Sequence, residues 1–109
     1  RYFDKAKAAT ARSQIEVISL ALNTYFLDTN TFPSEEQGLS ALKEKPTGQP
    51  DPKNWSGPYV SKSPELDPWG NPYIYVMPGP NGLPYGIMSY GRDGVEGGEG
   101  PDEDIKSWD

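Results

Sequence analysis

Apolar residues recur at alternating intervals of three and four along the first part of the chain. The repeating positions are Ala8, Ala11, Ile15, Ile18, Leu22 and Tyr25. This spacing places all of them on one face of an α-helix. No Gly or Pro interrupts residues 1–29, and the segment 30–33 ends the run. We therefore predict a long helix over 1–29. Because its first residues offer no N-cap, we expect this helix to begin upstream of Arg1.

A short second helix is expected over 33–45. Ser34 and Gln37 have the spacing of a capping box, and Pro46 would end the helix. Residues 46–72 then carry seven prolines and no helical period. We predict an ordered Pro-rich loop there, pinned to the domain by its large apolar residues Trp55, Tyr59, Val60, Leu66 and Trp69.

Two β-strands are predicted in the last third of the chain. Residues 72–77 and 85–90 are rich in β-branched and aromatic side chains, and a Pro/Gly/Asn cluster at 78–82 separates them. We expect an antiparallel β-hairpin over 73–90, then a Gly-rich acidic loop at 91–104 and a final edge strand at 105–109. The predicted fold class is α+β, a long helix packed on a small antiparallel sheet within one domain, 1–109.

Composition and charge narrow the possible functions. The chain has 109 residues, of which none is Cys or His, so disulfides, thiol catalysis and a Ser-His-Asp triad are excluded. The whole net charge of −6 lies within residues 93–109. This acidic balance argues against nucleic acid or an anionic membrane surface as a partner and favours cations or basic partners.

The acidic loop is the segment with the clearest chemistry. Six carboxylates lie between residues 93 and 104, and four glycines among them let the backbone fold tightly. Calcium takes six to eight oxygen ligands from such loops, although the EF-hand pattern is not present. A solvated acidic segment that binds nothing is the alternative. A paired-carboxylate hydrolase using Glu96 and Glu99 is less favoured, since no pocket is evident from the sequence.

Several motifs occur in one order along nearly the whole chain. They are Thr10-Ala-Arg-Ser-Gln-Ile15, Glu36-Gln-Gly-Leu39, Gly57-Pro-Tyr59, Asp67-Pro-Trp-Gly-Asn-Pro-Tyr73, Ser89-Tyr-Gly-Arg-Asp-Gly94 and Asp102-Glu-Asp-Ile105. Together they resemble the soluble periplasmic domain of the major pseudopilins of the bacterial type II secretion system. The resemblance implies a type IV pilin-like fold and a structural role with no enzymatic activity.

The resemblance also implies a life cycle. Family members carry a hydrophobic N-terminal helix half, missing from this sequence, which inserts into the inner membrane. They are cleaved and N-methylated there and polymerise into a periplasmic filament, the pseudopilus, which helps to export folded proteins through the outer membrane. The expected partners are further copies of the chain, minor pseudopilins and an inner-membrane assembly platform. A type IV pilin or a minor pseudopilin is an alternative in the same class.

Calcium bound by the acidic loop is a further implication of the resemblance. The side chains expected to ligate it are those of Asp93, Asp102 and Asp104, and the expected backbone carbonyls are those of Tyr90, Arg92 and Val95. The choice among Asp102, Glu103 and Asp104 stays open, because the loop has extra residues around 97–100 compared with shorter family loops. A calcium-dependent adhesin or lectin-like module, with Trp55 or Trp69 on its ligand, is an alternative of another class.

Overall fold

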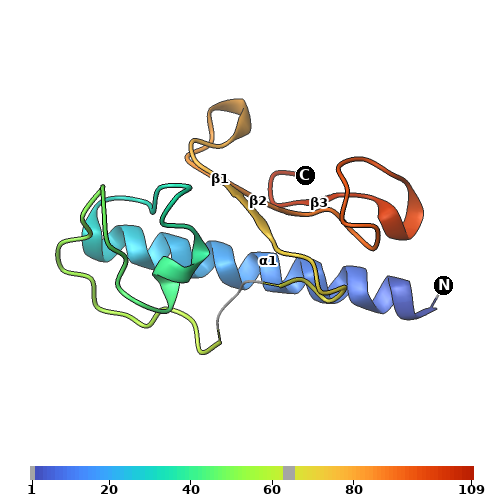
Figure 1. Ribbon diagram of the computed structural model, residues 1–109, viewed down its shortest axis with the longest axis horizontal. Coiled ribbons are helices and arrows are strands. Elements are labelled where there is room, and N and C mark those ends of the chain that lie inside the picture. The colour runs from blue at the N-terminus through green and yellow to red at the C-terminus, as the bar shows by residue number, and fades with distance from the viewer. Residues whose placement is uncertain (1, 63–65) are drawn as a thin grey trace.

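The longest element, α1, runs the length of the molecule beneath a small sheet (Figure 1). The computed structural model describes residues 2–62 and 66–109, and in it α1 extends over Tyr2–Thr29. The predicted long helix is therefore confirmed over its described part. It ends because Asn30 takes a left-handed φ of 59° while its N–H donates to the carbonyl of Phe26 at 2.7 Å. A residue in that conformation satisfies the last turn but cannot continue the helix.

Three short strands form one antiparallel sheet in the order β1-β2-β3. They are β1 (Ile74–Val76), β2 (Gly86–Ser89) and β3 (Ile105–Lys106). The hairpin and the final strand are confirmed, but each strand is shorter than predicted. The ladder between β2 and β3 is only half formed after Lys106: the Ser107 N–H donates to the Ile87 carbonyl at 2.8 Å, but the Ile87 N–H donates to the Ser107 hydroxyl at 3.0 Å in place of a backbone carbonyl.

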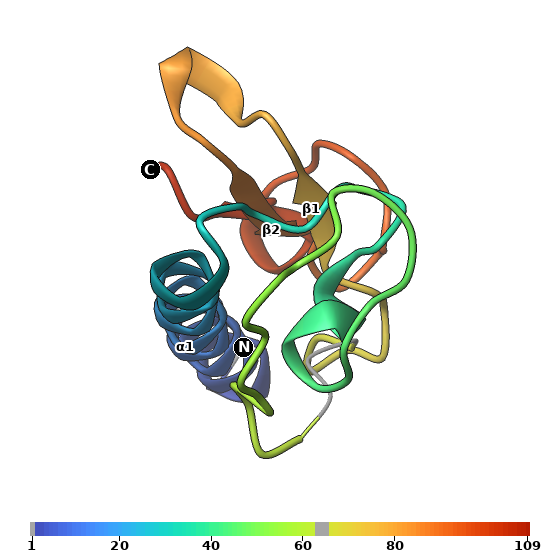
Figure 2. The same cartoon turned by 90° about the vertical axis from the view of Figure 1, so that its left-hand side faces the viewer.

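The core lies between α1 and the sheet, which Figure 2 shows nearly along the helix axis. Helix α1 supplies half of the buried residues listed below, namely the predicted apolar face together with Ala21, while Ala8, at the edge of that face, is only partly buried. The buried apolar residues are Ala11, Ile15, Ile18, Ala21, Leu22, Tyr25, Leu39, Ala41, Leu42, Tyr73, Ile87 and Ile105. Burial of this set is the main driving force that holds helix and sheet together.

The predicted second helix over 33–45 is wrong as an α-helix. Ser34 and Gln37 do form the reciprocal capping pair: the Ser34 N–H donates to Gln37 Oε1 at 2.9 Å, and the Gln37 N–H donates to Ser34 Oγ at 3.1 Å. They close a turn instead of starting a helix, because Gly38 follows with a φ of 67°. Only a 3₁₀ turn forms after it, at Leu39–Leu42.

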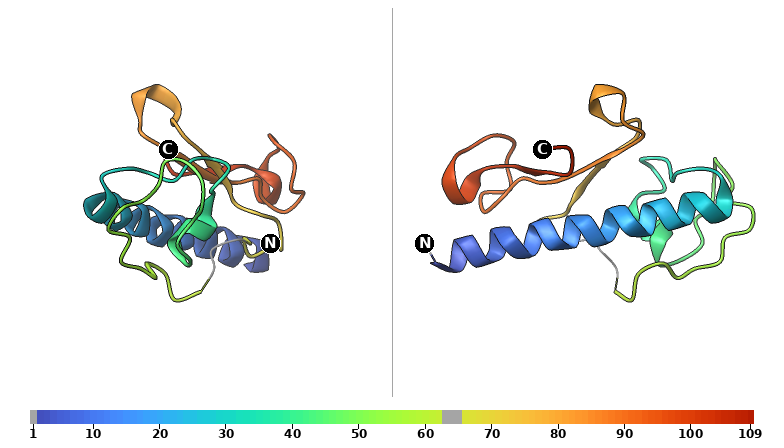
Figure 3. Two further views of the ribbon diagram at one scale, coloured as in Figure 1. Left: turned by 60° about the vertical axis from the view of Figure 1, so that its left-hand side comes forward. Right: turned by 180° about the vertical axis from the view of Figure 1, so that it is seen from behind.

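The Pro-rich segment wraps around the C-terminal half of α1 (Figures 1 and 3). Trp55 donates its indole N–H to the Ala41 carbonyl at 2.9 Å, and Tyr59 donates its hydroxyl to Asp28 at 2.7 Å. Trp55, Tyr59, Val60 and Trp69 pack against the core as expected. Leu66 does not, since it is 58% exposed, and the prediction that it anchors the loop is wrong. Positions 63–65 of the predicted loop lie outside the described residues.

Candidate functional site at the acidic loop

The acidic loop, residues 91–104, is closed at its base by backbone contacts. The Arg92 N–H donates to the Pro101 carbonyl at 2.9 Å. Gly91 has a φ of 82°, and a Cβ on it would lie 2.8 Å from the Glu103 carbonyl oxygen. Only glycine fits such a close approach in this backbone conformation. The loop thus leaves β2 and returns to β3 through one narrow neck, on the side of the N-terminal half of α1 (Figure 3).

The three predicted carboxylate ligands do not gather at one point. Asp93 accepts the N–H of Val95 at 3.1 Å, while Asp104 accepts the N–H of Gly97 through both carboxylate oxygens, at 3.1 and 3.0 Å. Asp102 is paired with the Arg92 guanidinium at 3.2 Å. Among the residues that the structure describes, no group of three carboxylates stands close enough to hold a metal ion.

The Arg92 side chain has a role that the sequence did not predict. Only its carbonyl was expected to matter, yet its guanidinium pairs with Asp102 in the loop and lies 3.6 Å from Asp4 in α1. The side chain is about half exposed, at 53%, so solvent screens both ion pairs and each contributes little to stability. The ion pair with Asp102 occupies one of the predicted ligand carboxylates, and the ion pair with Asp4 links the loop to α1.

A buried carboxylate near the loop was also missed. Asp67 is 5% exposed and closes a tight turn, Asp67–Asn71. Its Oδ1 accepts the N–H of Trp69 at 3.0 Å and that of Asn71 at 2.9 Å. An Asp followed by Pro and Gly is a turn signal in any sequence. That signal predicts the turn, but not which distant segment the turn supports.

The oxygen atoms of the loop are of the type that a hard cation binds. Its ionisable side chains are all carboxylates except that of Arg92, and backbone carbonyl oxygens lie close together in it. A Cβ on Gly98 would lie 2.6 Å from the Asp102 carbonyl oxygen, and one on Gly91 would lie 3.0 Å from the same atom. Oxygen donors of this type, in an irregular Gly-rich loop, suit calcium better than the regular octahedron of magnesium.

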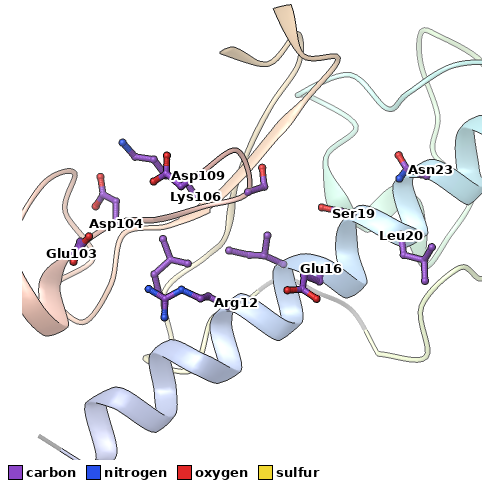
Figure 4. A pocket seen from close by; sticks show the side chains of 12 residues that line it. Arg12, Glu16, Ser19, Leu20, Asn23, Glu103, Asp104, Lys106 and Asp109 are labelled. Atoms are coloured by element: carbon purple, nitrogen blue, oxygen red, sulfur yellow. The ribbon is translucent and has the colours of Figure 1, made fainter. Parts of the chain in front are cut away.

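A cleft lies between α1 and β3 (Figure 4). Its charged lining is of both signs, with Arg12 and Lys106 beside Glu16, Glu103, Asp104 and Asp109. Glu96 and Glu99, the two carboxylates proposed for a hydrolase, are exposed and do not line it. The cleft joins the end of the acidic loop to the helix, and the chain has no Cys or His that could act there as a nucleophile or base.

Comparison with known proteins decides the family. The sequence model of "Type II secretion system (T2SS), protein G" matches residues 1–108. The chain belongs to this family. It is 49% identical over 106 residues to the type II secretion system core protein G of Pseudomonas aeruginosa, an alignment that covers 97% of this chain and 74% of that protein. It is 42% identical over 108 residues to the core protein G of Vibrio cholerae, covering 96% and 72% respectively.

A solved structure supports the same assignment. The crystal structure of the major pseudopilin from the type 2 secretion system of enterohaemorrhagic Escherichia coli matches with a TM-score of 0.83 at 39% identity, over 98% of this chain and 90% of that one. The resemblance to major pseudopilins and the predicted α+β fold are therefore confirmed, and the relatives of this chain are structural subunits of the secretion system, not enzymes. Over the described residues, no helix combines the length and the apolar character needed to cross a membrane.

Proposed function

We propose that this chain is the periplasmic part of a subunit that polymerises into the pseudopilus and so helps to export folded proteins through the outer membrane. Before assembly, the full-length protein would be anchored in the inner membrane. The observation that carries the proposal is the family match over residues 1–108. Minor pseudopilins and the inner-membrane assembly platform would be its partners.

The outer face of α1 supports a role in assembly. Val17, Leu20 and Leu27 lie on the side of the helix that faces away from the core, and they are 60%, 68% and 83% exposed. Thr24, between them, is also exposed, and it donates its hydroxyl to the Leu20 carbonyl at 3.0 Å. Large apolar side chains gathered on one exposed helix face are typical of protein–protein contacts.

A structural calcium ion in the acidic loop is the second part of the proposal. Asp93, Asp102 and Asp104 would supply carboxylate oxygens, and Tyr90, Arg92 and Val95 would supply carbonyls. The ion would neutralise the crowded charge of the loop. On binding, Asp102 would have to leave the Arg92 guanidinium, from which it lies 3.2 Å away, and Asp104 would have to turn from the Gly97 N–H. Arg92 and Gly97 are both exposed, so breaking these two contacts costs little free energy.

A chimera tests the assembly proposal. The N-terminal part of the P. aeruginosa relative would be joined to residues 1–109 of this chain and expressed in cells that lack their own protein G. We expect periplasmic filaments and restored secretion. Leu20→Glu and Leu27→Glu should abolish both, whereas Ser40→Glu, at an exposed position outside the outer face of α1, should abolish neither. A chimera that is stable in cells but forms no filaments would contradict the proposal.

A further inference from the structure

The turn Asp67–Asn71 and the first residue of the acidic loop are joined by a chain of hydrogen bonds. The Ser89 hydroxyl donates to Asp67 Oδ2 at 2.6 Å, and the Gly91 N–H donates to Ser89 Oγ at 3.1 Å. From the other side, the Asn71 side-chain amide donates to the Gly91 carbonyl at 3.2 Å. Both backbone polar groups of Gly91 are therefore held by residues that lie outside the loop.

These contacts are shielded from water. Ser89 is completely buried, Asp67 is 5% exposed, and Gly91 itself is buried. The charged acceptor strengthens the hydrogen bond from Ser89, since bonds to an ionised group are roughly twice as strong as neutral ones. A buried carboxylate is costly unless it is fully hydrogen-bonded. Asp67 meets that condition through Trp69, Asn71 and Ser89.

Holding Gly91 fixes the direction of two neighbouring carbonyls. Peptide groups are planar and trans, so the N–H of Gly91 and the carbonyl of Tyr90 belong to one rigid plane and point in opposite directions. The carbonyl of Gly91 shares the next plane with the N–H of Arg92, which donates to Pro101. The turn thereby determines where the Tyr90 carbonyl, one of the expected ligands, is aimed, and how the neck of the loop closes.

We propose that Asp67, Asn71 and Ser89 are positioning residues of the acidic loop, which order its neck before any cation binds and raise its affinity for calcium without ligating the ion. The part of this inference that concerns affinity rests on the proposed calcium site. The part that concerns order does not, because the hydrogen bonds on which it depends join Asp67, Asn71, Ser89 and Gly91, none of which is an expected ligand of the ion. Outer partners of this kind typically change metal affinity by about 10- to 100-fold.

The test compares Asn71→Ala and Ser89→Ala with Gln37→Ala. Gln37 is a matched control because its side-chain amide also donates to loop carbonyls, those of Thr47 and Pro50, but in a different loop. Calcium affinity would be measured by titration calorimetry at a temperature where circular dichroism shows every variant folded. Hydrogen exchange of the Arg92 and Gly97 amides would be followed in EDTA, since both are hydrogen-bonded within the loop.

We expect Asn71→Ala and Ser89→Ala to weaken calcium binding by about 10-fold or more and to speed exchange at both amides, while Gln37→Ala matches the wild type in both measurements. Wild-type affinity and wild-type exchange in the two variants would overturn the inference. If the wild type binds no calcium, the proposed metal site fails. The exchange data then decide the inference alone: faster exchange in the two variants supports it, and unchanged exchange overturns it.

Discussion

Truncation of Leu22 tests how much the buried face of α1 contributes to the free energy of unfolding. Leu22 is fully buried in the face of α1 that packs against the core, whereas Leu20, two residues earlier, is 68% exposed. A buried Leu→Ala change removes apolar contacts and leaves a cavity, which costs about 2–5 kcal/mol. Because Leu22 has no exposed area, we expect about 3 kcal/mol for Leu22→Ala. Leu20→Ala should stay within about 0.5 kcal/mol of the wild type.

Equilibrium unfolding in urea measures this difference. With a slope of about 2 kcal/mol per molar urea, the midpoint of Leu22→Ala should fall by about 1.5 M, while that of Leu20→Ala should hardly move. The slope itself should stay constant, since the surface exposed on unfolding is nearly the same. A loss below about 0.5 kcal/mol for Leu22→Ala, or equal losses for the two variants, would refute the assignment of the buried face.

Three further outcomes are expected. Gly91→Ala should lower the free energy of unfolding by at least about 1–3 kcal/mol in urea melts, since φ is 82° and a Cβ would lie 2.8 Å from the Glu103 carbonyl oxygen; an unchanged midpoint would contradict the geometry of the neck. The Tyr25 hydroxyl is buried with no hydrogen-bond partner among the described residues, and burial raises its pKa to about 12. In the unfolded chain the pKa of this hydroxyl is about 10. Between about pH 10 and 12 the hydroxyl therefore ionises in the unfolded state but stays protonated in the folded state, so the free energy of unfolding is unaffected at neutral pH and falls over that range. Tyr25→Phe should therefore be neutral or stabilising at pH 7 and should reduce the alkaline loss in urea melts; equal alkaline losses would argue against it. Finally, light scattering in low salt should find residues 1–109 monomeric, because the net charge of −6 opposes association; a tight oligomer would contradict this.

The long helix and the sheet order could be predicted because their signals are local. The alternating spacing from Ala8 to Tyr25 has no interruption, and the structure buries that face as expected. The second helix failed because a capping box is also compatible with a single turn. A single turn forms here because Gly38 has a positive φ and because the Gln37 side chain donates to the carbonyls of Thr47 and Pro50 further along the chain. No local pattern carries that information.

The acidic loop likewise has features that its local sequence predicts and others that depend on residues far away in the sequence. Its bounds follow from its glycines and carboxylates, and it connects β2 to β3 as predicted. The support of the loop could not be predicted, because Asp67 and Ser89 are 22 residues apart in sequence and meet only when the sheet has formed. The Arg92 side chain was missed for a related reason, since its partner Asp4 lies at the far end of the chain. Pairings over such distances depend on the tertiary fold.

The proposed cation site can be tested most directly by thermal unfolding of residues 1–109 with calcium and with EDTA after rigorous calcium removal. A ligand at about 100 times its dissociation constant stabilises the native state by about 2.7 kcal/mol, and each kcal/mol raises the melting temperature of a domain near this size by about 4–8 °C. We predict a calcium-dependent rise of at least several degrees that Asp93→Ala abolishes and Glu96→Ala leaves intact, with magnesium a poor substitute. Identical melting temperatures of the wild type in calcium and in EDTA would contradict the account and leave the loop as a solvated acidic segment.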